Sequence, residues 1–154
     1  MALMSDASDD IPALLNGSMG QTIPVLAHMG LEVIEAAPGR AAARVPMDGN
    51  GNHVGTMYAG VLFSVAEMLG GALSLATFDP ARFYPIVKDL RIDFRRPAAS
   101  AITARTSLDR AEIDRVLADA ERDGKGQFTL ASELTDEDGT VVATTEGTYQ
   151  IRPH

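Results

Sequence analysis

A single carboxylate, Glu67, stands in the middle of an otherwise apolar run of about twenty residues, from Met57 to Phe78. Burying a charge without a partner costs free energy, so Glu67 is either a paired structural residue or a group used for chemistry. A carboxylate in such a position can activate a water or attack a carbonyl carbon, and donors near it can stabilise the developing oxyanion. Glu67 is the only carboxylate of the predicted helix, which makes it the candidate general base or nucleophile. Apolar surroundings would raise its pKa toward neutral pH.

The loop before this helix offers further polar groups. The backbone N–H groups of Ala59 and Gly60 lie at the predicted helix N-terminus, where free donors and the helix dipole can polarise a carbonyl. Asn52 is either a functional amide or one of the turn residues that such loops need. His53 and Tyr58 are the other candidates for positioning a substrate. The simpler interpretations are that His53 is an exposed loop residue and that Tyr58 closes the loop.

Three arginines, Arg91, Arg95 and Arg96, form a local basic edge on an acidic chain. One interpretation is a clasp for the phosphates of a ligand, because guanidinium groups bind phosphate through paired hydrogen bonds. The other is a set of solvated arginines that pair with Asp89 and Asp93. Both interpretations stay open on the sequence alone.

The composition narrows the class of protein. The 154 residues suggest one domain with a sizeable core. The net charge of −8, with no basic run to offset it, argues against nucleic acid as the main partner. The chain has no cysteine, and its three histidines show no ligand spacing, so we expect no metal site and no cofactor.

Two segments of the sequence bear on where in the cell the protein is expected. The first ten residues are acidic and lack the basic and apolar regions of a signal peptide, so we expect a flexible tail and a cytoplasmic protein. The run from Met57 to Phe78 is long enough to cross a membrane. However, Glu67 near its centre and the strands that follow favour a helix buried inside a soluble protein.

Hydrophobic periodicity and turn signals predict strands and helices in alternation. The predicted elements are one or two helical turns within 11–29, strands at 31–37 and 40–46, a helix at 57–77, strands at 85–97 and 101–108, a helix from 109 to 124, and strands at 127–135 and 140–151. Asp109 and Glu112 form a capping-box-like start of the short helix at 109–124, and Gly124 supplies its stop. In the strand at 85–97, one face carries Lys88, Leu90, Ile92 and Phe94, and the other carries Asp89, Arg91, Asp93 and Arg95. We expect the first face to lie on the core and the second to be wetter.

This element order predicts an α+β fold. Consecutive strands with short connections favour an antiparallel sheet, and a helix this apolar has to be covered on most sides. We therefore expect a curved antiparallel sheet wrapped around the long helix, with an isologous partner subunit completing the cover. Residues 1–24 are assigned to a flexible or short helical N-terminal segment, and residues 25–154 to a single domain.

Residues 52–60 read Asn-His-Val-Gly-Thr-Met-Tyr-Ala-Gly, and Glu67 follows Asn52 by fifteen residues. This segment resembles the motif of PaaI-type hotdog-fold thioesterases: an Asn, then Gly-Thr, then His-Gly-Gly at the helix start, then an acidic residue deeper in the helix. The next strand is also similar, down to an aromatic-x-x-Pro-Ala ending at 94–98. Two features depart from the family pattern. Tyr-Ala-Gly at 58–60 replaces His-Gly-Gly, and Val87 replaces a Ser or Thr that assists some members.

The resemblance covers roughly residues 25–151 and implies a hotdog-fold acyl-CoA thioesterase that works as a homodimer or dimer of dimers. Asn52 then meets Glu67 across the dimer interface and orients the water or the thioester. The clasp of Arg91, Arg95 and Arg96 would then bind the phosphates of coenzyme A. One alternative is a non-catalytic module that binds an acyl group or acyl-CoA. Another is a hotdog enoyl hydratase or dehydratase, which pairs a loop His with a helix Glu fourteen residues later, the spacing of His53 and Glu67. In those enzymes Phe-Pro-Gly follows the His, and here Val-Gly-Thr does.

Overall fold

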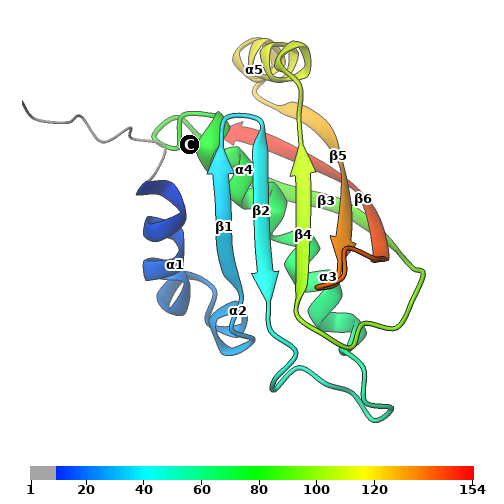
Figure 1. Cartoon of the computed structure of the whole chain (residues 1–154). Coiled ribbons are helices and arrows are strands. Elements are labelled where there is room, and N and C mark those ends of the chain that lie inside the picture. The colour runs from blue at the N-terminus through cyan, green and yellow to red at the C-terminus, as the bar shows by residue number, and fades with distance from the viewer. Residues whose placement is uncertain (1–9) are drawn as a thin grey trace, which may run out of the picture.

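The computed structural model describes residues 10–154, and within them it contains five helices and six strands (Figure 1). In chain order these are α1 (Asp10–Thr22), α2 (Pro24–His28), β1 (Glu32–Ala37), β2 (Arg40–Val45), α3 (Ala59–Glu67), α4 (Leu69–Thr77), β3 (Phe83–Phe94), β4 (Ile102–Ser107), α5 (Arg110–Asp123), β5 (Gly126–Thr135) and β6 (Val141–Pro153). The expected tail, over residues 1–9, lies outside the described residues.

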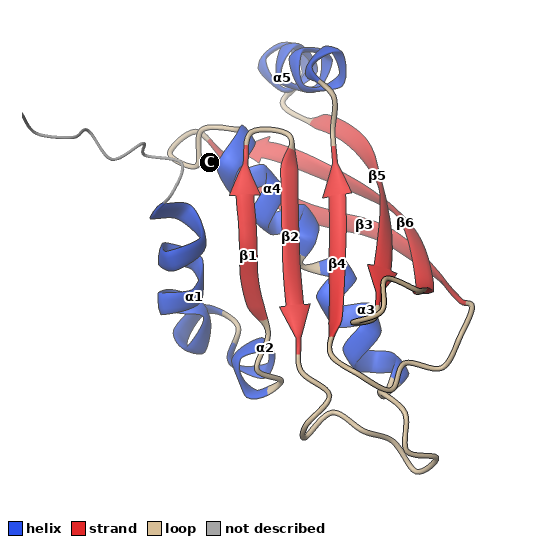
Figure 2. Cartoon of the chain, in the orientation of Figure 1, coloured by secondary structure: helices blue, strands red, loops and turns tan. Residues whose placement is uncertain are grey.

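All six strands form one antiparallel sheet in the order β1-β2-β4-β5-β6-β3. The sheet curves around the helix pair α3 and α4, and β1, β2 and β4 lie in front of these helices in Figure 2. α4 contacts β1 to β4, and α3 contacts β2 to β6. The predicted α+β fold, a curved antiparallel sheet around a long central helix, is confirmed.

The central helix is interrupted by one residue, where the sequence predicted an unbroken helix. α3 ends at Glu67 and α4 begins at Leu69. Met68, between them, has φ −66° and ψ −17°, so the chain turns more tightly here than in an ideal α-helix. The combined helix is long and apolar enough to cross a membrane, but 56% of its 18-residue apolar window is buried in the fold, which is typical of a core helix.

The strand β3 forms one edge of the sheet and carries a β-bulge at Lys88. A bulge adds a residue to one strand and so interrupts the alternation of faces. Lys88 is consequently exposed, whereas Leu90 and Ile92 are half-buried. Phe94, at the end of the strand, is 53% exposed. The predicted core-facing row therefore holds for Leu90 and Ile92 and is wrong for Lys88 and Phe94.

The N-terminal helices are longer than predicted. Asn16, Gly17 and Pro24 suggested only short helical turns, but α1 runs through Asn16 and Gly17 for 13 residues. Pro24 begins α2, a position where its missing N–H costs nothing. Two hydrogen bonds join the side chain of Asn16 to the backbone of Val33 in β1: Nδ2 donates to the carbonyl at 2.9 Å, and Oδ1 accepts from the N–H at 2.8 Å. These contacts to a distant strand hold α1, which explains why local signals underestimated it.

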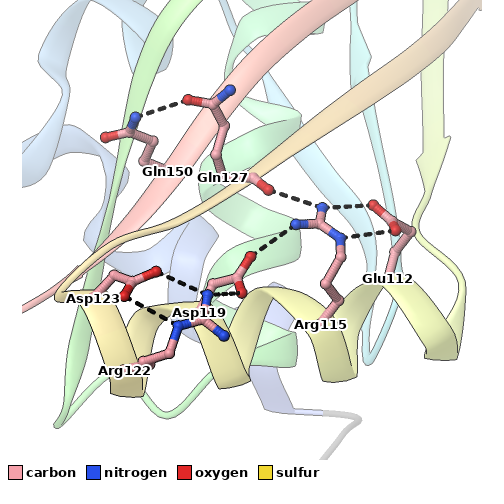
Figure 3. A network of polar contacts seen from close by, with 7 residues as sticks. All are labelled: Glu112, Arg115, Asp119, Arg122, Asp123, Gln127 and Gln150. Carbon is pink, nitrogen blue, oxygen red and sulfur yellow. Dashed lines mark hydrogen bonds and ion pairs between the residues drawn. The ribbon is translucent and has the colours of Figure 1, made fainter.

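The helix α5 has both predicted caps. Asp109 accepts a hydrogen bond from the N–H of Glu112 at 2.8 Å, and Gly124 ends the helix with φ 72°. Figure 3 shows Arg115 between Glu112 and Asp119, and its guanidinium also donates to the carbonyl of Gln127 in β5 at 3.0 Å. This polar network fixes α5 at one end of the sheet, away from the central helix.

Candidate active site

Glu67 lies in a groove between α2, α3 and β3 with a volume of about 440 Å³. Its apolar lining consists of Ile23, Val25, Leu26, Phe63, Val87 and Leu90. Its polar lining consists of Ser64, Glu67, Lys88 and Asp89. Small-molecule pockets in proteins typically measure roughly 300–1,000 Å³ and are mostly apolar with a few polar groups, so the Glu67 groove has the size and character of a ligand site.

The carboxylate of Glu67 has no partner among the residues that the structure describes. Within residues 10–154 it makes no hydrogen bond and no ion pair, and the side-chain hydroxyl nearest along the helix, that of Ser64, donates to the carbonyl of Gly60 at 2.7 Å. Burial raises the pKa of Glu67 above its ordinary value of 4.5, because desolvation disfavours the charged form. The interpretation of Glu67 as a paired structural carboxylate therefore finds no support within one chain.

The side chain of Asn52 organises its own loop. Its Oδ1 accepts from the N–H groups of Val54 at 3.0 Å and Thr56 at 3.1 Å, and its Nδ2 donates to the Thr56 hydroxyl at 3.0 Å. An amide nitrogen carries two hydrogens, so one N–H is left over. Asn52 does not line the groove of Glu67 in the same chain, and its meeting with Glu67 across a dimer interface stays a prediction.

A buried residue that the sequence analysis did not single out, Asn50, fixes this loop to the body of the domain. It is 6% exposed, and its Nδ2 donates to the carbonyls of Met29 and Pro46 at 2.8 Å each. Its own carbonyl accepts from the N–H of Tyr58 at 2.9 Å. His53 is exposed at the tip of the loop, as its simpler interpretation predicted. The loop is thus held at its base and presents its tip to solvent.

The N-terminus of α3 has two free donors. Tyr58 is the N-cap residue and its side chain makes no capping bond, and the N–H groups of Ala59 and Gly60 have no acceptor among residues 10–154. The ring of Tyr58 lies directly on Gly60, where a Cβ would come within 2.5 Å of its Cε1. Glycine is therefore required at residue 60 for the ring to occupy this place. The exposed ring forms a wall beside the two free amides.

One chain cannot bring these amides and Glu67 to the same carbonyl. Ala59 and Glu67 are about 12 Å apart along the helix, because an α-helix rises about 1.5 Å per residue. A reacting carbonyl needs its oxyanion donors and its attacking group each within about 3 Å. The amides and the carboxylate are therefore halves of two different sites unless a second chain contributes.

The three arginines considered for coenzyme A do not line the Glu67 groove. Arg91 and Arg95 line a different groove of about 980 Å³, on the face of the sheet that turns away from α3 and α4. Arg91 pairs with Asp93 at 3.2 Å, as the simpler interpretation predicted, and Arg95 donates to the hydroxyl of Thr144 at 3.3 Å. Arg96 is exposed. The structure thus separates these arginines from Glu67.

The sequence analysis missed two residues next to Glu67. Lys88 shares its groove and makes no ion pair within the described part of the chain. Alternation placed Lys88 on the same strand face as Leu90, which also lines the groove, but no sequence signal linked that face to Glu67. Tyr149 in β6 donates from its hydroxyl to the backbone carbonyl of Glu67 at 3.0 Å. These two residues are 82 positions apart, so periodicity alone marked Tyr149 as part of a strand and gave it no link to Glu67.

Solved structures of other proteins share this architecture. A Pseudomonas aeruginosa protein of unknown function, described as a probable thioesterase, is 43% identical, with a TM-score of 0.85 over 93% of this chain and 97% of its own. A second protein of that species, a thioesterase crystallised as a mutant, is 18% identical, with a TM-score of 0.74 over 99% of this chain and 97% of its own. The second likeness shows the fold alone. The predicted hotdog fold is confirmed, whereas the PaaI-type branch stays a prediction.

The amino-acid sequence also matches a known protein and a family model. A Deinococcus radiodurans protein named "Putative esterase" is 30% identical over 82 residues, and the match spans about half of each protein, 52% of both. A family model described as "Domain of unknown function (DUF4442)" matches residues 12–151, which is nearly all of the described structure. The chain, with its hotdog fold and its half-buried glutamate, therefore belongs to the DUF4442 family.

Proposed function

We propose that this protein is an acyl thioesterase that hydrolyses acyl-coenzyme A as a homodimer or a dimer of dimers, with Glu67 as the general base or nucleophile. The observation that carries the proposal is the half-buried carboxylate of Glu67, which has no partner within residues 10–154 and lies in a mostly apolar groove. The names of the 43% identical probable thioesterase and of the 30% identical "Putative esterase" support the same reaction class. A fold by itself would not, because one fold hosts many activities.

The chemistry follows from the position of Glu67. As general base, the carboxylate takes a proton from water while the water oxygen bonds to the thioester carbonyl carbon. The tetrahedral intermediate then collapses, the carbon–sulfur bond breaks, and the proton returns to the leaving sulfur, giving a carboxylic acid and a thiol. A raised pKa suits this task, since a base works best when its pKa is near the working pH.

The negative charge that develops on the carbonyl oxygen needs donors, and the free amides of Ala59 and Gly60 are suited to this role. Because they lie about 12 Å along the helix from Glu67 of the same chain, the amides of one subunit serve the Glu67 of the other. An isologous dimer builds two such sites at once. Asn52, whose second amide N–H is left over, orients the water or the thioester from the same loop.

The acyl group occupies the apolar part of the Glu67 groove, against Phe63 and the residues from 23 to 26. Met68, next to Glu67 in the helix, is half-buried and packs against the core. The proposed clasp of coenzyme A phosphates by Arg91, Arg95 and Arg96 draws no support from the geometry, because Arg91 and Arg95 line the opposite face of the sheet. The groove therefore carries the proposed substrate class, and phosphate binding by the three arginines stays a separate prediction.

The test is release of free thiol from a panel of acyl-coenzyme A substrates of varied chain length, aliphatic and aromatic. We expect Glu67→Gln to lower kcat/KM by at least ~10²-fold, the range for a positioned acid–base group, with the circular dichroism spectrum unchanged. The matched control is Glu133→Gln, the same change on the outer face of the sheet, which should leave the rate unaffected. Equal rates in Glu67→Gln and wild type would refute Glu67 as base.

The same panel separates the two alternatives. If no substrate is hydrolysed but acyl-coenzyme A raises the melting temperature, the protein is a binding module. A change in absorbance on crotonyl-coenzyme A that disappears in His53→Ala would favour a hydratase. The exposed position of His53, outside the Glu67 groove of its own chain, makes the hydratase the less favoured alternative.

A further inference from the structure

Tyr149 is a buried residue whose hydroxyl reaches from the sheet to the central helix. It lies on β6 and is 3% exposed. Its hydroxyl donates to the backbone carbonyl of Glu67 at 3.0 Å. Few buried tyrosines leave their hydroxyl without a partner, but here the partner is the very residue whose side chain lies in the groove.

The ring of Tyr149 is held in one place by two glycines. A Cβ at Gly70 would lie 2.0 Å from its Cε1, and a Cβ at Gly147 would lie 3.0 Å from its Cε2. Phe128 stacks on the ring at a centroid distance of 5.8 Å and an angle of 18°. Any side chain at residue 70 would displace the ring, because real Cβ atoms do not approach carbon that closely. The position of the hydroxyl is therefore set by the packing of three residues.

The hydrogen bond falls where the helix is interrupted. α3 ends at Glu67, and Met68 has a ψ of −17° before α4 resumes. A side-chain donor that engages a helix carbonyl is a recognised cause of such local distortions. Since the carbonyl and the side chain of Glu67 leave the same Cα, fixing the carbonyl also restricts where the carboxylate can point. The bond from Tyr149 is thus a tertiary restraint on the backbone from which the Glu67 side chain leaves.

The charged groups that face Glu67 across its groove are few. Lys88 and Asp89 come from β3, and the lining from α2 is entirely apolar. Asp89 is engaged, because its Oδ1 accepts from the N–H of Thr148 at 3.1 Å. Burial and the nearby Glu67 charge raise the pKa of the Tyr149 hydroxyl, so it stays protonated and remains a donor at every pH at which the protein would work.

We propose that Tyr149 is a positioning residue for Glu67: its hydroxyl holds the Glu67 carbonyl at the helix interruption and thereby keeps the carboxylate in the apolar groove. The proposal rests on the proposed function in one respect, namely that Glu67 acts on a substrate. Tyr149 itself touches neither substrate nor reacting atoms. Without its hydroxyl, the carboxylate is free to turn toward water.

The test is Tyr149→Phe, which keeps the ring, its stacking on Phe128 and its fit against Gly70 while removing the hydrogen bond. We expect kcat to fall about tenfold, at the low end of the effects of acid–base groups, with KM little changed. The acid limb of the kcat profile should move to lower pH, because a solvated carboxylate has a lower pKa. The matched control is Tyr84→Phe, which removes a hydroxyl from a partly exposed tyrosine on β3 and should change neither quantity.

A second measurement makes the result independent of turnover. The pKa of Glu67 can be followed by NMR with 13C-labelled glutamate, assigned by its loss in Glu67→Gln. We expect a raised pKa in wild type and a lower one in Tyr149→Phe. A shift in the NMR titration without any thioester hydrolysis in wild type would sink the proposed function and leave the positioning role standing.

The positioning role is overturned by either of two results. One is a Tyr149→Phe variant with a lower melting temperature but an unchanged Glu67 pKa and acid limb, which would make the hydroxyl merely structural. The other is an ordinary Glu67 pKa in wild type, and this measurement serves even where Tyr149→Phe does not fold.

Discussion

The two edges of the sheet are finished in opposite ways. At the β1 edge, α1 packs alongside the strand, and the side-chain amide of Asn16 bonds to both the N–H and the carbonyl of Val33, as a neighbouring strand would (Figure 1). At the other edge, β3 pairs with β6 on one side only, and no helix or strand among residues 10–154 pairs with its other side. Val87 there is 44% exposed. One edge is closed and the other is left open.

The open edge lies next to the candidate site. Residues 87–90 are at once part of the open strand and one wall of the Glu67 groove. An open apolar edge invites pairing with another chain, and proteins restrict such pairing with Lys, Pro and bulges. Pro85 and the bulge at Lys88 are devices of this kind. We infer that β3 is suited to one specific partner, a second copy of this chain, and this is the copy that the separated halves of the site require.

The largest expected effect comes from a charge at the open edge. Val87 lies near the middle of β3, so antiparallel pairing of two copies would bring two Val87 residues close together. Val87→Asp places like charges there, and we expect a monomer by sedimentation equilibrium. Thioesterase activity should fall by at least ~10²-fold, since each Glu67 loses its oxyanion donors.

The matched control is the same change on the closed edge. Ile34 in β1 is 42% exposed, close to the value for Val87. Ile34→Asp should leave the oligomer and the activity as in wild type. If both variants remain dimeric, or both dissociate, the two edges do not differ in the way inferred here. Because Val87 also lines the groove, the oligomeric state, and not the activity, decides this test.

A smaller effect is expected at the closed edge. Asn16→Ala removes both hydrogen bonds to Val33 and leaves a partly buried N–H and carbonyl without partners. We expect the free energy of unfolding to fall by about 1–3 kcal/mol, the usual penalty for such groups, with the oligomeric state unchanged. Gln21→Ala, an exposed position on the same helix, serves as the control in urea unfolding. A destabilisation no larger than that of the control would mean that Asn16 does not close the edge.

The fold was largely predictable because most elements carry strong local signals. The hairpin turn at Gly39, the caps of α5 at Asp109 and Gly124, and the alternation in β5 each match a short-range pattern. The failures come from long-range contacts. α1 is held by a side chain reaching β1, and the interruption after Glu67 coincides with a hydroxyl from β6. Neither contact leaves a trace in the sequence next to the element it affects.

In the candidate site, too, local signals identified some residues and missed those that depend on long-range contacts. Glu67 stood out because a carboxylate is anomalous in an apolar helix, and the free amides of Ala59 and Gly60 followed from helix geometry alone. Lys88 was placed on the same strand face as Leu90, which also lines the groove, but no local signal linked that face of β3 to Glu67. The arginines were considered for coenzyme A because they form a local basic edge in the sequence, but alternation in β3 puts Arg91 and Arg95 on the other face of the sheet.

The smallest expected effect is a pH dependence of the unfolding free energy that comes from Glu67, whose groove adjoins the open edge. Burial raises the pKa of Glu67 above 4.5, so the folded state binds more protons than the unfolded state between 4.5 and the raised value. Stability contributed by the protonated carboxyl is therefore fully present below pH 4.5 and is lost as the pH rises through this window. Urea unfolding of wild type and Glu67→Gln across this range should show wild type losing unfolding free energy relative to Glu67→Gln as the pH rises. A second copy on β3 would bury Glu67 further and enlarge the slope, so Val87→Asp should reduce it and Ile34→Asp should not. Equal slopes in wild type and Glu67→Gln would mean that the groove leaves the carboxylate as well solvated as an exposed one.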